Sequence, residues 1–218
     1  MKQEVLMKFN NATDDDVNGR YRSWEHCYKY FADNRKKPDI DTMCLHLGFY
    51  LASWGMYRGS SFLLQKDYLV HKPVVELLLE DKYEKLWYCT SHDLLDDNIV
   101  NLILDVRARI IKAYENQPNC RRPTDTLVTK ILMGTFGCLP AYDSYLIDGI
   151  KSEKVATPTL GKKSIKQIAN YYIENEVLFE EAREVINKNG VEYPQLKLLD
   201  MYFWQIGYDL NLAKKEKE

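Results

Sequence analysis

The sequence has few features of proteins that are disulfide-bonded, membrane-anchored or secreted. Its five cysteines are widely spaced and never form C-x-x-C, which predicts reduced, mostly buried thiols and no disulfide framework. No stretch reaches the roughly 18 apolar residues of a membrane-spanning helix. The segment from Met1 to Phe9 also lacks the apolar core of a secretory signal. We therefore expect a cytoplasmic protein with no membrane partner.

Neither sign of charge is in large excess. The 218 residues include 30 basic and 32 acidic side chains, which gives a formal net charge of -2. Proteins whose whole surface binds a polyanion usually have a strong basic excess, so this class is excluded, whereas a local basic groove is not. Aromatic residues are plentiful by contrast, with 16 tyrosines, 7 phenylalanines and 4 tryptophans.

Common catalytic and metal-binding motifs are missing as well. The sequence contains no G-x-S-x-G, P-loop, G-x-G-x-x-G or H-E-x-x-H, so the corresponding mechanisms have no support. Cys44 and His46 are close in sequence, but residues two apart on a helix point in nearly opposite directions. His92 lies beside aspartates that are explained more simply as helix caps. We predict no metal site and no cofactor.

Apolar residues recur at helical spacing along nearly the whole chain. The clearest set consists of Val17, Tyr21, Trp24, Tyr28 and Phe31. Similar patterns predict helices at about 41–57, 74–87, 97–116, 124–134, 145–150, 164–188 and 195–210. Asp39 or Asp41 is expected to cap the helix at 41, and Asp96 or Asp97 the helix at 97. The predicted fold class is all-α, a compact bundle of about eight to ten helices.

We expect a single helical domain in which two lobes flank a groove. One predicted lobe combines residues 1–37 with 164–218, and the other comprises residues 38–155. The two ends of the chain have patterns of their own. Val5, Met7 and Phe9 recur at every second position, which predicts a short extended segment. Residues 211–218, rich in lysine and glutamate, predict a frayed polar tail.

The most informative stretch surrounds Asp143. An apolar helix from Thr124 to Gly134 leads into a glycine-bearing turn and Pro140, and Asp143 follows where the next helix should start. Asp143 then has two explanations. It either caps that helix, or the turn holds its carboxylate in a cleft, where it is desolvated and able to stabilise a cation. The residues by themselves favour the cap.

Three stretches resemble known protein families. The runs TKILMGTFGCLPAYDSYL (129–146) and LKLLDMYFWQIGYDL (196–210) resemble the helix-hairpin-helix DNA glycosylase superfamily. The run LASWGMYRGSSFLLQ (51–65) resembles a bacterial family that carries no assigned activity. The glycosylase resemblance implies nucleic acid as partner and Asp143 as the acid that stabilises the sugar cation when a base leaves. It also makes Tyr142 and Tyr145 candidates for stacking on a flipped base.

The sequence departs from the glycosylase pattern before and after the core helix. Segment 118–130 contains none of the glycines whose N–H groups normally bind a phosphate. Arg121 and Arg122 would have to supply side-chain charge instead, with Lys130 completing a basic rim. The acid also follows Pro140 by three positions, where the superfamily usually has two. A shared scaffold that has lost its DNA chemistry also fits these residues.

The alternative function is a non-enzymatic helical protein–protein interaction module. In this hypothesis tyrosines and tryptophans are core and interface anchors, and Asp143 is only a cap. The segment 52–61 suits both functions. Its small residues, Gly55 and Gly59 among them, let the backbone approach either another helix or a phosphate, for which Arg58 would add charge. Close helix packing is the simpler of these two interpretations.

Overall fold

A computed structural model describes residues 1–187 and 191–216, and every regular element in these ranges is helical. The predicted all-α class is thereby confirmed. The α-helices are α1 (Gln3–Asp14), α2 (Arg22–Asn34), α3 (Ile40–Ser53), α4 (Lys72–Leu78), α5 (Asp97–Glu115), α6 (Asp125–Gly134), α7 (Ser144–Ser152), α8 (Lys162–Glu174), α9 (Glu176–Ile186) and α10 (Gln195–Lys215). Four short 3-10 helices are η1 (Phe62–Gln65), η2 (Tyr68–His71), η3 (Asp81–Leu86) and η4 (Asp93–Leu95).

The two ends of the chain differ from the predictions. Residues 5–9, predicted to be extended, belong to α1, so that prediction is wrong. Leu6, Phe9 and Thr13 are buried at helical spacing, and this period, rather than the alternation of Val5 and Met7, determines the structure. At the other end α10 continues to Lys215, into the predicted tail. Residues 217–218 of that tail lie outside the described residues.

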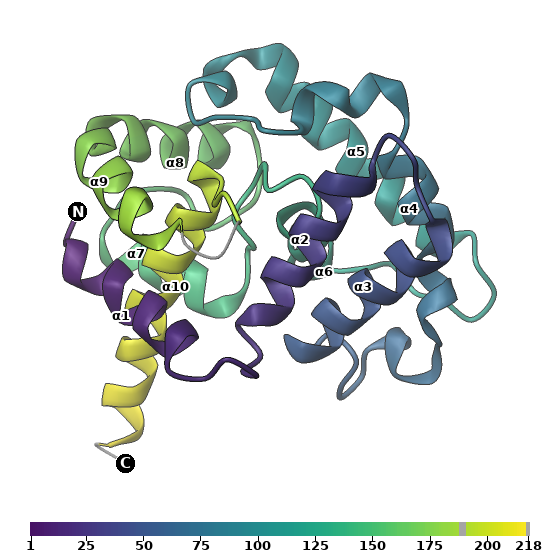
Figure 1. Cartoon of the computed structure of the whole chain (residues 1–218), viewed down its shortest axis with the longest axis horizontal. Helices are drawn as coiled ribbons and strands as arrows, with labels where there is room; N and C mark the ends of the chain where they lie inside the picture. The colour runs from purple at the N-terminus through teal and green to yellow at the C-terminus, as the bar shows by residue number, and fades with distance from the viewer. Residues whose placement is uncertain (188–190, 217–218) are drawn as a thin grey trace.

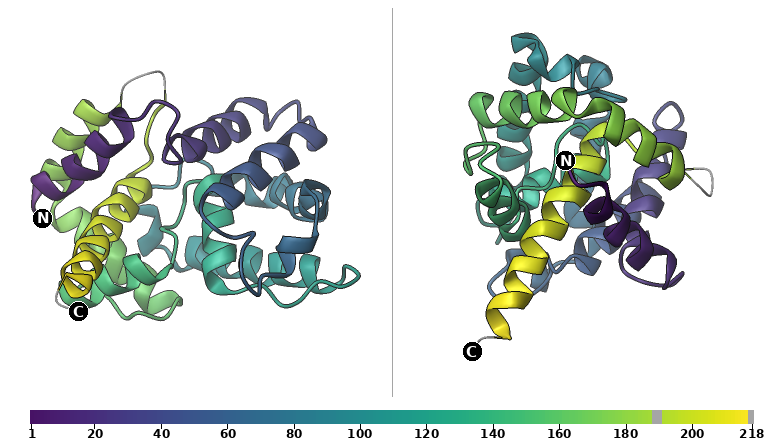
Figure 2. Two further views of the ribbon diagram at one scale, coloured as in Figure 1. Left: turned by 90° about the horizontal axis from the view of Figure 1, so that it is seen from below. Right: turned by 90° about the vertical axis from the view of Figure 1, so that its left-hand side faces the viewer.

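The helices form two groups, which Figures 1 and 2 show from three directions. In one group α1 packs on α9 and α10, and α7 makes the most extensive helix contact of all with α10. In the other group α2 packs on α3 and α6, while α4 packs on α3 and α5. This division differs from the predicted lobes, which had placed α2 with the C-terminal helices and α7 with the central ones.

Two glycines explain the partnership between α7 and α10. A Cβ atom added to Gly149 of α7 would overlap the backbone carbonyl of Phe203, and one added to Gly207 of α10 would overlap that of Tyr145. The two helices therefore approach each other until the backbone of one meets the backbone of the other at both glycines. This contact closes only when both positions lack a side chain.

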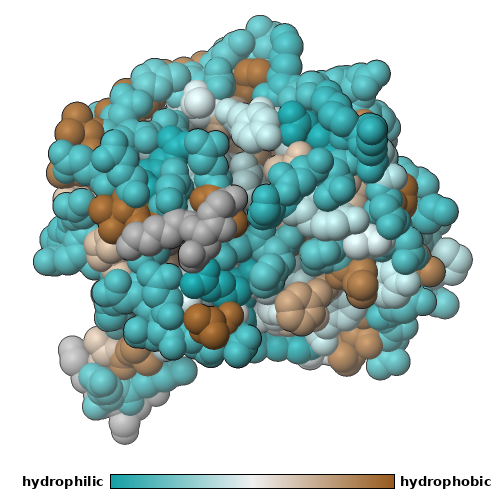
Figure 3. All heavy atoms as spheres, in the orientation of Figure 1, coloured by the Kyte–Doolittle hydropathy of each residue, from teal (hydrophilic) through white to brown (hydrophobic). Residues whose placement is uncertain are grey.

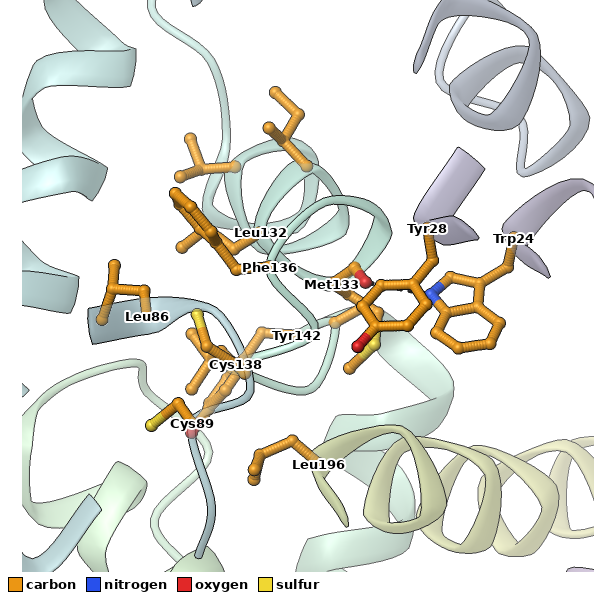
Figure 4. Close-up of a cluster of buried hydrophobic side chains, with 14 of the residues drawn as sticks. Trp24, Tyr28, Leu86, Cys89, Leu132, Met133, Phe136, Cys138, Tyr142 and Leu196 are labelled. Carbon is orange, nitrogen blue, oxygen red and sulfur yellow. Dashed lines mark hydrogen bonds between the residues drawn. The ribbon is translucent and has the colours of Figure 1, made fainter. Parts of the chain in front are cut away.

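Helix α6 lies at the centre of the core. All of its residues from Leu127 to Gly134 are buried, and Figure 4 shows Leu132, Met133 and Phe136 among side chains from several other elements. The indole Nε1 of Trp24 donates a hydrogen bond of 2.9 Å to the Met133 carbonyl. The chain stays buried from Leu127 to Asp143, so any charge on this segment lies in the interior.

Candidate functional site

A surface groove lies between the loop that follows α3 and the loop that precedes α6. Two adjoining pockets form it, with volumes of about 460 Å³ and 490 Å³, and they share Arg121 and residues 59–62. The first pocket is also lined by Gly55, Met56, Arg58, Arg122, Pro123, Thr124 and Leu127. The second is also lined by Leu64, Gln65, Lys66 and Asn119.

Local sequence shapes both walls of the groove. Gly55 and Gly59 have φ angles of 75° and 61°, in the left-handed region that glycine adopts without strain, and they turn the chain after α3. The Ser61 hydroxyl accepts a hydrogen bond of 3.2 Å from the N–H of Leu63 and so caps η1. On the opposite wall the hydroxyl of Thr124 caps α6. The groove thus lies between two capped helix starts.

The arginines of the groove have few carboxylate partners. Within the described residues, neither Arg58 nor Arg121 has a carboxylate within ion-pair distance, and Arg122 lies 3.3 Å from Glu115. None of the residues that line the two pockets is acidic. Arg107, by contrast, is closely paired, with its Nε 2.7 Å from an Asp125 oxygen. The groove is therefore a local excess of positive charge on a chain with a net charge of -2.

The structure brings the predicted residues Arg121 and Arg122 into this groove, but it places Asp143 elsewhere. Asp143 is buried, and its Oδ1 accepts a hydrogen bond of 3.0 Å from the N–H of Leu146, which makes it the cap of α7. Its Oδ2 lies 2.9 Å from the Nζ atom of Lys130. Asp143 does not line either pocket of the groove.

Lys130 was predicted to complete a basic rim, and the structure corrects this. Its side chain is only 5% exposed, because α6 is surrounded by other helices, and it pairs with Asp143. The Nζ atom also lies 5.0 Å from the ring centroid of Trp54, a favourable distance for a cation–π contact. A phosphate on the surface has no access to this ammonium group.

A second buried pair was not predicted. Lys197 and Asp200, one turn apart on α10, approach to 2.8 Å, and Asp200 also accepts a hydrogen bond of 2.9 Å from the N–H of Ala141. The Lys197 ammonium lies 4.9 Å from the ring centroid of Trp24 and 6.0 Å from that of Trp54. Two charges spaced at i and i+3 in the apolar run LKLLDMYFW were the pattern that marked this pair in the sequence. Both buried pairs thus flank Trp54.

The two predicted stacking residues have other contacts. Tyr142 is 2% exposed, and its hydroxyl lies 2.9 Å from the Oγ atom of Ser164, so the prediction that it stacks on a base is wrong for this structure. Tyr145 is half-buried. Its ring packs edge-on against Trp204 at 5.2 Å and against Tyr208 at 5.6 Å between centroids.

His71 forms a buried polar network that the sequence did not reveal. Its Nε2 lies 2.7 Å from the Tyr57 hydroxyl, and its Nδ1 lies 2.6 Å from the Tyr114 hydroxyl. Burial lowers the pKa of His71 to about 3. The imidazole is therefore neutral at neutral pH, with one ring nitrogen donating and the other accepting a hydrogen bond.

An apolar surface on α3 is the observation that favours the alternative function, an interaction module. Leu45 and Phe49, one helical turn apart, are 51% and 61% exposed. Apolar atoms gather in Figure 3 at the lower right, where Figure 1 places α3. Exposed apolar surface of this kind occurs at protein-binding sites, but single exposed residues are also normal.

Comparisons with known proteins identify no relative of this chain. No protein-family model, curated protein or solved structure matches the chain. In the ranges 1–187 and 191–216, no helix has both the length and the apolar character required to cross a bilayer.

Proposed function

We propose that this protein binds nucleic acid and that the groove between residues 55–66 and 119–124 holds the phosphate backbone. The observation that carries the proposal is the pair Arg58 and Arg121, which have no carboxylate partner among the described residues and line a pocket without acidic residues. Guanidinium groups bind phosphate oxygens through charge-assisted, often bidentate hydrogen bonds. The turn at Gly59, where a Cβ atom would meet no atom within 4 Å, also leaves backbone accessible to a close ligand.

The length of the groove favours a chain of phosphates over one small anion. The second pocket continues from the first along shared residues and adds Lys66, whose Nζ donates to the Pro118 carbonyl at 2.8 Å. Phosphates repeat along a nucleic acid, so cations placed along a groove can each meet one. Sequence-independent contacts of this kind supply affinity, while base edges supply specificity.

The proposal does not include removal of a base. Both oxygens of Asp143 are already hydrogen-bonded, one to the N–H of Leu146 and one to Lys130. A carboxylate neutralised by its own ion pair adds little stabilisation to a sugar cation. Incubation with oligonucleotides that carry damaged bases is expected to release no base. Base release by wild type that is lost in Asp143→Asn, with the variant shown to be folded by circular dichroism, would restore the glycosylase hypothesis.

The test is binding of fluorescent single-stranded and duplex oligonucleotides, followed by anisotropy across a salt titration. Wild type is expected to bind with an affinity that falls as salt rises. The double variant Arg58→Gln/Arg121→Gln should bind at least roughly tenfold more weakly. Lys8→Gln is the matched control, because Lys8 is an exposed cation that pairs with Asp209 on the other helix group.

Two results would contradict the proposal. One is an absence of salt-sensitive binding to either oligonucleotide. The other is an equal loss of affinity in Lys8→Gln and in the double arginine variant, since this would place the binding outside the groove. Circular dichroism melts of each variant show whether the fold is retained, so that a loss of binding can be assigned to the lost charge.

A further inference from the structure

The basic groove has two unlike ends. A third pocket, of about 390 Å³, shares Gln65 and Lys66 with the second pocket and shares no residue with the first, so the three follow one another in a row. The first pocket holds the three arginines. The third contains Asp67, whose carboxylate would repel a phosphate. Positive charge is therefore concentrated at one end of the row.

The arginine pocket is the end member of this row of three pockets. The other side chains that line the first pocket include Met56, Pro123 and Leu127, which carry no charge. A nucleic acid that lies along these three pockets thus meets the strongest group of cations at one end of the row. Such an arrangement suits the terminus of a strand better than its middle.

The charges in the pocket match a terminal phosphate better than an internal one. An internal phosphodiester carries one negative charge, whereas a phosphomonoester with a second pKa near 6 carries close to two at neutral pH. Two arginines without a described carboxylate partner and a third that is 66% exposed provide more than one positive charge. Ser60 and Ser61 add hydroxyl donors to the same pocket.

We infer that the pocket formed by Arg58, Arg121 and Arg122 binds the terminal phosphomonoester of a nucleic-acid strand. This inference rests on the proposed function, because it assigns one end of the same groove to one end of the same ligand. The strand leaves the pocket past Lys66. The terminal phosphate sets the position of the strand in the groove, and the internal phosphates add affinity that does not depend on position.

The experiment compares single-stranded oligonucleotides of about ten nucleotides and identical sequence that carry a 5′-phosphate, a 3′-phosphate or two hydroxyl ends. Wild type is expected to bind one phosphorylated form roughly tenfold more tightly than the hydroxyl form. Arg121→Gln should abolish this difference. Lys66→Gln is the matched control, because it should weaken all three oligonucleotides alike and keep the difference.

Competition with a nucleoside monophosphate and with inorganic phosphate shows whether the pocket binds the end of a strand or a free phosphate compound. Both are expected to compete weakly, and only against the phosphorylated oligonucleotide. If all three oligonucleotides bind wild type equally, the terminal-phosphate inference is overturned while the proposed function stands. If no oligonucleotide binds in a salt-sensitive way, both fall. A nucleoside monophosphate that binds as tightly as the phosphorylated strand would show that the pocket takes a free nucleotide, and would also overturn the inference.

Discussion

Lys130 and Asp143 form an ion pair of 2.9 Å inside the protein, with side chains that are 5% and 12% exposed. The lysine comes from α6 and the aspartate caps α7, so the pair joins two consecutive helices that belong to different groups. Removing two charges from water is costly, and the cost is repaid only when each charge has good partners. Asp143 has two such partners, and Lys130 has the carboxylate and the ring of Trp54.

Breaking this pair from one side is expected to destabilise the fold strongly. Asp143→Asn keeps a side chain able to cap α7 but leaves the Lys130 ammonium buried without a counter-charge, which should cost roughly 3 kcal/mol or more of the free energy of unfolding. The double variant Lys130→Met/Asp143→Asn should recover most of that loss. Urea unfolding of Lys130→Met, Asp143→Asn and the double variant measures the coupling free energy between the two side chains. A loss below about 1 kcal/mol in Asp143→Asn would show that the pair contributes little.

The close crossing of α7 and α10 gives a second prediction. Gly207→Ala places a methyl group where the Tyr145 carbonyl lies, and should lower the free energy of unfolding by roughly 2 to 3 kcal/mol. Gly161→Ala is the control, because a Cβ at that position meets no atom within 4 Å and the change should cost at most about 1 kcal/mol. Equal melting temperatures for the two variants would refute the close contact.

His71 should make stability depend on pH below about 6.5, and between pH 7 and 5 this effect lies above the range where most carboxyl groups titrate. In the unfolded chain its pKa is near 6.5, whereas in the folded protein burial lowers it to about 3. Between these values the unfolded state binds the proton and the folded state does not, so stability falls as pH drops from 6.5 towards 3. Above pH 6.5 both states are neutral and the effect vanishes.

The size of this effect follows from the same linkage. Between pH 7 and pH 5 the free energy of unfolding should fall by about 2 kcal/mol on account of His71. His71→Gln keeps a donor and an acceptor for the hydroxyls of Tyr57 and Tyr114 but cannot titrate. Its stability should therefore change much less over this range. Parallel curves for wild type and variant, measured by urea unfolding, would contradict the assignment.

The salt dependence of binding should show which arginines of the groove contact phosphates. Each arginine that contacts a phosphate contributes about 0.7 to the slope of log affinity against log salt for a single strand. Arg58→Gln and Arg121→Gln should each lower the slope by about that amount, and the double variant by about twice as much. Arg109→Gln is expected to leave it unchanged, because Arg109 pairs with Glu80 outside the two groove pockets. A slope unaffected by either groove variant would mean that phosphates bind elsewhere.

The start of a helix could be predicted from a few neighbouring residues. Asp39 and Asp96 were each one of two candidate caps, and both accept a hydrogen bond from an N–H two or three residues ahead. Asp143 caps α7 in the way that its position after Pro140 suggested. Such bonds join atoms close in sequence, so the residue types at consecutive positions are enough to predict them.

The candidate site was predictable only in part. Arg121 and Arg122, between two prolines in a short loop, had to lie near the surface, and they do. Arg58 becomes their neighbour only because the loop after α3 folds against that loop, across more than sixty residues of sequence. Lysine and tyrosine have polar groups that also suit the surface, so the residue types did not reveal burial. Lys130 and Tyr142 are nevertheless buried, because helices from elsewhere in the chain cover them.

The sequence by itself determined the all-α class, most helix boundaries and the loops that carry arginine, because backbone hydrogen bonds, caps and apolar period act over a few residues. The tertiary structure alone decided which charges pair and which stay free. Lys130 is neutralised by Asp143, whereas Arg58 and Arg121 meet no carboxylate among the described residues and face a common pocket. Burial and charge pairing depend on which helix faces meet, and these meetings join residues far apart in the chain.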